Sequence, residues 1–260
     1  MLGTSRTHRP RGFGVWTHAG IAAVVLVVVT GFVALRSATA RQGQPDAELI
    51  ERGRELYETG CTSCHGFDGR GVEDRGPSLE QAGAASAHFY LSSGRMPTDD
   101  PGRQTVRKPP KYDPDEIDAL VAYVASLGDG PDIPRIDPAT GDLAEGQQLY
   151  TVNCAACHNA AGSGGALGQA IYAPSLRDAT PQQVAEAVRI GPGAMPVFGP
   201  EAIADQELAS IVRYVDYLED PEDPGGLPLG RLGPVPEGLV AWVVGVGAVL
   251  VFARWLGARR

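Results

Sequence analysis

Two pentapeptides of the same form, CTSCH at Cys61–His65 and CAACH at Cys154–His158, contain all four cysteines of this 260-residue chain. In each, two cysteines three positions apart on a helical turn present both thiols on one side, and the next residue presents an imidazole. Two Cys-x-x-Cys pairs also describe a structural zinc site, but such pairs lie within roughly 15 to 20 residues of each other. The separation here is far greater, and a histidine follows both pairs. We therefore predict that the chain carries two covalently attached c-type haems.

Each pentapeptide is followed by one methionine in a repeated context. The chain has three methionines, of which Met1 is the initiator and the others are Met96 and Met195. Both are followed by proline and preceded by a glycine-bearing turn. A single methionine is more often core filler than an iron ligand, but two in one repeated context favour ligation. The predicted residues are, for haem 1, Cys61 and Cys64 with axial ligands His65 and Met96, and, for haem 2, Cys154 and Cys157 with axial ligands His158 and Met195.

Axial ligation by histidine and methionine fills all six positions on the iron. Because no position is left for oxygen or peroxide, such a haem transfers electrons and does no bond chemistry, and the thioether raises its potential. We therefore expect no catalytic residue in this chain. Among the other histidines, we interpret His88 as an ordinary helix residue, with hydrogen bonding to a haem propionate as the alternative.

The segments around the two pentapeptides form an internal repeat. Gly53–Tyr57 precedes the first pentapeptide at the same spacing at which Gly146–Tyr150 precedes the second. Each unit ends in an amphipathic segment, Asp115–Val124 or Gln206–Val215, whose apolar residues recur at helical intervals. Each unit is therefore predicted to be mainly α, in the order helix, pentapeptide, glycine-rich loops, methionine loop, closing helix.

This order of elements resembles the class I cytochrome c fold. In that fold the first and last helices cross closely, which requires a small residue on one helix and an aromatic residue on the other. The matching positions here are Gly53 and Tyr57 with Tyr123, and Gly146 and Tyr150 with Tyr214. The resemblance implies two tandem class I cytochrome c domains. Because a unit of about 80 residues buries little apolar surface of its own, we expect the haem to supply much of its core.

Both ends of the chain contain long apolar runs without charge. With their flanks, Ala19–Leu35 and Gly238–Ala253 approach the ~20 residues that a helix needs to span a bilayer. Arginines precede the first run and follow the second, so we expect a two-pass protein of the cell membrane with both termini cytoplasmic. All acidic residues fall between Asp46 and Glu237, so the negative charge behind the chain's net −9 lies in the expected extracytoplasmic part.

A cleaved secretory signal is the alternative interpretation of the first run, with Ala38–Ala40 as a small-residue cleavage site. We favour an uncleaved anchor, because the run exceeds the about 7 to 15 apolar residues of a signal peptide and Arg36 interrupts the approach to the site.

These features divide the chain into six predicted segments. The two segments rich in proline and glycine are expected to be semi-extended linkers that allow some relative motion. The segments are residues 1–45, a cytoplasmic N-terminus and transmembrane anchor; 46–128, cytochrome c domain 1; 129–141, a linker; 142–220, cytochrome c domain 2; 221–236, a second linker; and 237–260, a transmembrane helix and cytoplasmic C-terminus.

Several motifs resemble one family in particular. Asp74–Leu79 (DRGPSL), Ser92–Pro97 (SSGRMP), Arg107–Pro110 (RKPP) and Gly191–Gly199 (GPGAMPVFG) are similar to stretches of the dihaem cytochrome c subunit of the actinobacterial cytochrome bcc complex. The resemblance extends over nearly the whole chain, from anchor through two haem units to a second anchor.

The resemblance implies a role in the respiratory chain, as a subunit of a proton-translocating quinol–cytochrome c reductase that oxidises menaquinol. The expected partners are a cytochrome b subunit, a Rieske iron-sulfur protein, the copper-bearing subunit of an aa3-type cytochrome c oxidase, and the membrane; no nucleic acid is expected. In that family the Rieske protein reduces the first haem and the second haem delivers electrons to the oxidase.

Two other functions remain open from the residues. One is a membrane-anchored dihaem cytochrome c of another oxidase or donor system. The other is a dihaem peroxidase, which would need one five-coordinate iron and is disfavoured by the two matched methionines. The basic run Arg103–Lys111 is either a docking strip beside the first haem or a solvated loop.

Overall fold

The computed structural model describes residues 47–222 and 234–258, and nearly all regular structure in these ranges is helical. The predicted N-terminal span at 19–35, the candidate cleavage site at 38–40 and most of the second linker lie outside the described residues. We use "first domain" for the part from α2 to α5 and "second domain" for the part from η1 to α9.

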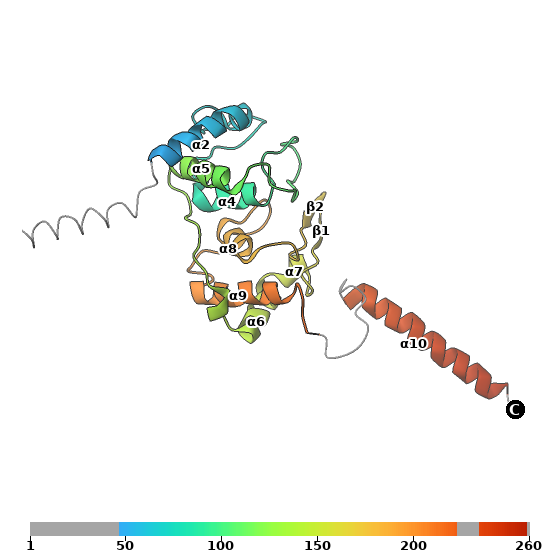
Figure 1. The fold of residues 1–260 in the computed structure, drawn as a ribbon. Helices are drawn as coiled ribbons and strands as arrows, with labels where there is room; N and C mark the ends of the chain where they lie inside the picture. The colour runs from blue at the N-terminus through green and yellow to red at the C-terminus, as the bar shows by residue number, and fades with distance from the viewer. Residues whose placement is uncertain (1–46, 223–233, 259–260) are drawn as a thin grey trace, which may run out of the picture. The chain divides into compact units, whose positions relative to one another are not determined.

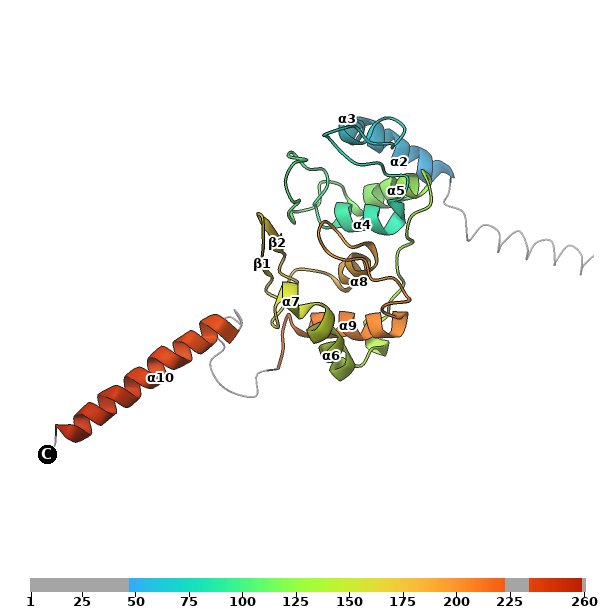
Figure 2. The same cartoon turned by 180° about the vertical axis from the view of Figure 1, so that it is seen from behind.

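The first domain comprises the helices α2 (Ala47–Gly60), α3 (Thr62–His65), α4 (Gly83–Ser92) and α5 (Pro114–Ala125). Helices α2, α4 and α5 are labelled in Figure 1, and α3 is labelled in Figure 2. The closing helix α5 has a well-defined start. Asp113 accepts a hydrogen bond from the Glu116 amide at 2.9 Å, and the Glu116 carboxylate accepts one from the Asp113 amide at 3.1 Å. Pro114 follows at the first helical position, where its missing N–H is not needed.

The second domain repeats this arrangement and adds a short 3-10 helix at its start and a pair of short strands. Its elements are η1 (Pro138–Thr140), α6 (Leu143–Asn153), α7 (Ala155–His158), β1 (Gly165–Gly168), β2 (Ile171–Ala173), α8 (Pro181–Ile190) and α9 (Asp205–Tyr217). The two short strands pair antiparallel between the pentapeptide and α8, and they are seen beside α7 in Figure 2. The helices correspond to those of the first domain in order.

The first and last helices of each domain cross through a glycine, as predicted. A Cβ atom on Gly53 would lie 2.0 Å from the Ala119 carbonyl oxygen, and one on Gly146 would lie 2.0 Å from that of Ser210. The tyrosine pairs pack beside these crossings, with ring centroids 5.0 Å apart for Tyr57–Tyr123 and 5.3 Å apart for Tyr150–Tyr214. Only glycine leaves room for the two backbones to approach so closely.

The two domains contact each other mainly through α4 and α8, which lie next to each other in Figures 1 and 2. The connection at residues 129–141, predicted to allow relative motion, is held by hydrogen bonds to both domains in its first half. The Pro131 carbonyl accepts from the Ala85 amide at 3.0 Å, and the Pro134 carbonyl accepts from the Gln182 side chain at 3.2 Å. The linker is therefore attached to α4 and to α8.

The C-terminal helix α10 (Pro234–Gly257) includes 23 residues with a mean hydropathy of 2.1, none of them buried in the protein. At 1.5 Å per residue this length exceeds the roughly 30 Å of a bilayer's hydrocarbon core. Among the described residues it is the one helix long and apolar enough to cross a membrane.

Candidate functional site

A continuous cavity of about 910 Å³ joins the two domains, and it is lined by predicted haem-binding residues from both. A neighbouring cavity of about 680 Å³ extends along the first domain. The larger cavity is lined by Cys61, His65, Met96, Cys154, Cys157, His158 and Met195, and the smaller one by Cys61, Cys64, His65 and Met96. All eight residues predicted from the sequence therefore face one of two adjoining spaces.

Both pentapeptide histidines are oriented by a backbone carbonyl. His65 Nδ1 lies 2.9 Å from the Pro77 oxygen, and His158 Nδ1 lies 3.1 Å from the Pro174 oxygen. Because a carbonyl oxygen only accepts, Nδ1 carries the proton in each case and the lone pair is on Nε2. This is the arrangement in which a second-shell hydrogen bond holds an imidazole for metal ligation.

The backbone at each pentapeptide is fixed by the tyrosine of the preceding helix. The Tyr57 hydroxyl donates to the Gly66 carbonyl at 2.7 Å, and the Tyr150 hydroxyl donates to the Asn159 carbonyl at 2.7 Å. Both acceptors directly follow the pentapeptide histidine. The tyrosine rings thus pack in the helix crossing while their hydroxyls hold the turn that carries the cysteines.

One cysteine of each pentapeptide, and His158, lie in surroundings that favour their neutral forms. Burial raises the pKa of the Cys61 and Cys154 thiols to about 11, and all four cysteines are free of disulfides. Burial lowers the pKa of His158, opposed by its hydrogen bond to Pro174, which favours the neutral imidazole. The donor set and the largely apolar walls therefore fit c-type haem.

The two methionine loops are anchored differently. In the first domain the Met96 amide donates to the Tyr90 carbonyl at 3.0 Å, and the Lys108 amide donates to the Ser93 carbonyl at 3.2 Å. In the second domain the buried guanidinium of Arg189 donates to the carbonyls of Phe198 and Ile203, at 2.9 and 2.8 Å. Each loop thereby presents its methionine to the cavity.

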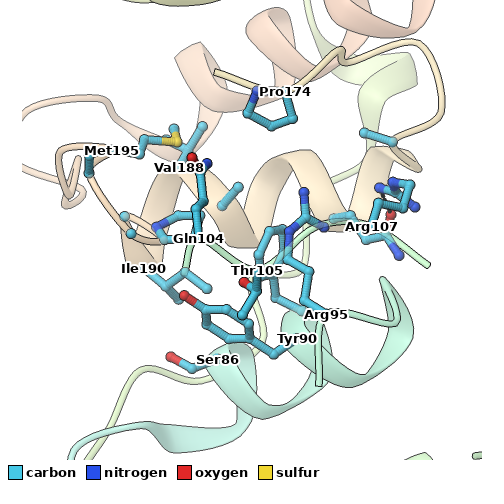
Figure 3. A pocket seen from close by; sticks show the side chains of 18 of the residues that line it. Ser86, Tyr90, Arg95, Gln104, Thr105, Arg107, Pro174, Val188, Ile190 and Met195 are labelled. Atoms are coloured by element: carbon cyan, nitrogen blue, oxygen red, sulfur yellow. Dashed lines mark hydrogen bonds between the residues drawn. The ribbon is translucent and has the colours of Figure 1, made fainter. Parts of the chain in front are cut away.

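The basic run Arg103–Lys111 has a role that sequence reasoning missed. Gln104 exchanges two hydrogen bonds with the Tyr172 backbone, at 2.8 and 3.0 Å, and the Arg107 guanidinium donates to the Gln183 side chain at 2.6 Å. Tyr172 and Gln183 belong to the second domain. The beginning of this run is therefore neither a free docking strip nor a solvated loop, because it connects the domains and lines the cavity (Figure 3).

His88 also differs from its interpretation as an ordinary helix residue. Its Nδ1 lies 2.7 Å from the Oε1 atom of Glu186, a fully buried carboxylate on α8. No local pattern connects two residues so far apart in sequence, so no sequence signal could have identified the pair.

Comparisons with known proteins agree with this arrangement. The first domain matches the family model "Cytochrome c" at residues 50–128, and the second matches "Cytochrome C oxidase, cbb3-type, subunit III" at residues 141–215. The chain contains two cytochrome c domains, and this family binds c-type haem covalently.

Relatives with curated names are similar over most of the chain. The "Cytochrome bc1 complex cytochrome c subunit" of Mycobacterium tuberculosis (strain ATCC 25618 / H37Rv) is 38% identical over 91% of this chain and 88% of its own. The subunit of the same name from Corynebacterium diphtheriae is 38% identical over 85% of this chain and 84% of its own. The cbb3-type oxidase subunit FixP of Bradyrhizobium diazoefficiens is 29% identical over 56% of this chain and 52% of its own. The two domain matches and this extended similarity establish that the chain belongs to the family of cytochrome c subunits of the cytochrome bc1 complex.

Proposed function

We propose that this chain carries two c-type haems and relays electrons from a Rieske iron-sulfur protein to an aa3-type oxidase during menaquinol oxidation by a cytochrome bc complex. The observation that carries the proposal is the cavity that both domains line. Seven of the eight predicted haem-binding residues line this cavity, and the eighth, Cys64, lines the adjoining one. When bound, each haem supplies an iron that exchanges one electron.

The protein's own residues favour electron transfer over bond chemistry. His65 and His158 are oriented from behind by carbonyls, and Met96 and Met195 face the same spaces. With both axial positions of each iron occupied, these residues leave no site for peroxide, which disfavours a peroxidase. The order that we propose, first domain as receiver and second domain as deliverer, follows the family resemblance of the sequence.

The first test is stoichiometry in the full-length protein purified from its membrane. A pyridine haemochrome assay is expected to give two haems per chain, and the ferric protein is expected to show the charge-transfer band of histidine–methionine haem for both. One haem per chain, or a band from only one centre, would reject the dihaem relay.

A second candidate function is a cytochrome c subunit of a cbb3-type or other oxidase, because the second domain matches that family model and FixP is similar over about half of the chain. Affinity purification from native membranes distinguishes the two functions. Co-purification of a cytochrome b and a Rieske protein is expected; an oxidase without either would favour the second function.

We also propose that the chain spans the membrane twice with both termini in the cytoplasm. Support comes from α10 and from the arginines that flank both apolar runs of the sequence. Reporter fusions at each terminus that are active only in the cytoplasm test this topology, and mass spectrometry of the mature N-terminus tests cleavage after residue 40.

A further inference from the structure

Arg95 is a buried cation without an anionic partner among the described residues. Its side chain is 8% exposed, and its Nη1 atom is buried without a hydrogen-bond partner. One face of the guanidinium is covered by the Phe89 ring, with Cζ 4.8 Å from the ring centroid. The guanidinium is therefore enclosed by protein, with one nitrogen left without an acceptor.

The cavity that Arg95 lines contains no carboxylate from the described part of the chain. Its charged lining residues, apart from the two histidines, are Arg95, Arg103 and Arg107. In Figure 3, Arg95 and Tyr90 come from the first domain, and Pro174 and Met195 come from the second. Buried charges in proteins are normally paired, so this position calls for an anion that enters the cavity.

The buried carboxylate of the α4–α8 contact has partners of its own. Glu186 contacts His88 and accepts a hydrogen bond from Gln182 at 3.0 Å. Arg107 donates to Gln183, whose amide in turn donates to Ser92 Oγ at 3.0 Å. These contacts hold the Arg107 guanidinium in the cavity wall. The Nη1 atom of Arg95, in contrast, is free to donate a hydrogen bond to a ligand.

We propose that Arg95, supported by Arg107, binds a haem propionate at the point where the two haem pockets join. This inference rests on the proposed function, because it requires haem in the cavity. A propionate is a carboxylate, and the planar guanidinium binds carboxylates through two parallel hydrogen bonds. Either haem could supply this propionate, because the cavity reaches both pentapeptides. The experiment therefore distinguishes the two haems as its source.

The charge pairing has a defined effect on redox potential. Paired with Arg95, the propionate contributes little net charge near the iron. Without Arg95, its uncompensated negative charge stabilises Fe(III) and lowers the potential. Burial then raises the pKa of the unpaired propionate, so the potential of that haem rises again as the pH falls and the carboxylate is protonated.

The experiment is a potentiometric titration of full-length Arg95→Gln protein at several pH values, after haemochrome assay. The potential of one or both haems is expected to fall and to become pH-dependent. Repeating the titration in Met96→His and Met195→His backgrounds, in which one haem is displaced to low potential, identifies the haem whose propionate is bound. Arg103→Gln is the matched control, because it removes the same charge from an exposed position of the same cavity, and its potentials are expected to match wild type.

Arg95→Lys provides a second measurement if the glutamine variant retains fewer than two haems. Lysine keeps the positive charge but lacks the planar guanidinium that forms two parallel hydrogen bonds. The potentials are therefore expected to lie near wild type, while the propionate bending band in the resonance Raman spectrum shifts. Two bound haems with unchanged potentials in Arg95→Gln, or an unchanged bending band in Arg95→Lys, would overturn the proposal. Fewer than two haems in wild-type protein would instead reject the proposed function.

Discussion

The Nδ1 atom of His88 on α4 lies 2.7 Å from the Oε1 atom of Glu186 on α8, so an imidazole–carboxylate contact joins the two cytochrome c domains. The Glu186 side chain is fully buried, whereas that of His88 is 25% exposed. The pair lies in the α4–α8 contact, beside the cavity that both domains line. It therefore bears on how firmly the two domains are held together.

Replacement of Glu186 by glutamine is expected to destabilise the protein. The change removes the charge that faces His88 and leaves a buried amide in its place, at a cost of about 1–3 kcal/mol. Thermal unfolding of the haem-loaded protein should show a lower Tm, by roughly 2–4 °C per kcal/mol. Glu219→Gln at an exposed position is the control, and an equal Tm for both variants would contradict a structural role of the pair.

The same pair predicts a pH dependence of stability. The contact with Glu186 is the main cause that raises the pKa of His88, with a smaller contribution from Asp118 on α5, while burial opposes both. Because the folded protein holds this proton more tightly than the unfolded chain, the stabilisation is fully present below the ordinary histidine pKa of about 6.5 and is lost as the pH rises through the raised value.

His88→Gln provides the measurement of this effect. The Tm difference between wild type and this variant is expected to be largest near about pH 6 and to shrink toward about pH 8. A difference that stays constant across this range would show that the imidazole acts by packing and not by its charge.

The glycine crossings predict a loss of stability on addition of one methyl group. In Gly53→Ala or Gly146→Ala the new Cβ would meet a backbone oxygen at 2.0 Å, so the two helices must separate. Overpacking of this kind costs about 1–3 kcal/mol or more. Denaturant unfolding of the haem-loaded protein measures it. Gly102→Ala, whose Cβ would have only a side-chain oxygen at 3.4 Å, should unfold like wild type.

Exchange of either methionine for histidine is expected to lower the potential of one haem and slow quinol oxidation. Imidazole favours Fe(III) relative to thioether, and a shift on the order of 0.1 V is a modest part of the roughly 0.8 V range that axial ligands produce. Redox titration of Met96→His and Met195→His protein, together with turnover in native membranes, provides the measurement. Unchanged turnover in both variants would remove this chain from the main electron path.

The sequence by itself determined the local chemistry of each domain. Cys-x-x-Cys-His encodes thiols and an imidazole within one helical turn, so the kind of cofactor can be inferred without a fold. The resemblance to the class I cytochrome c fold predicted a glycine–tyrosine crossing in each repeat, and the structure shows both crossings. The C-terminal apolar helix was likewise visible as a long run without charge.

Only the tertiary structure decided how the two domains meet. His88 and Glu186, Arg107 and Gln183, and Gln104 and Tyr172 are pairs of residues far apart in the chain. Periodicity and motif spacing report neighbours within a turn or a few turns, and a contact between α4 and α8 leaves no trace at that range. Arg95 shows the same limit: its sequence position beside Met96 suggests nothing unusual, and its burial without an anion becomes evident only when both domains surround it.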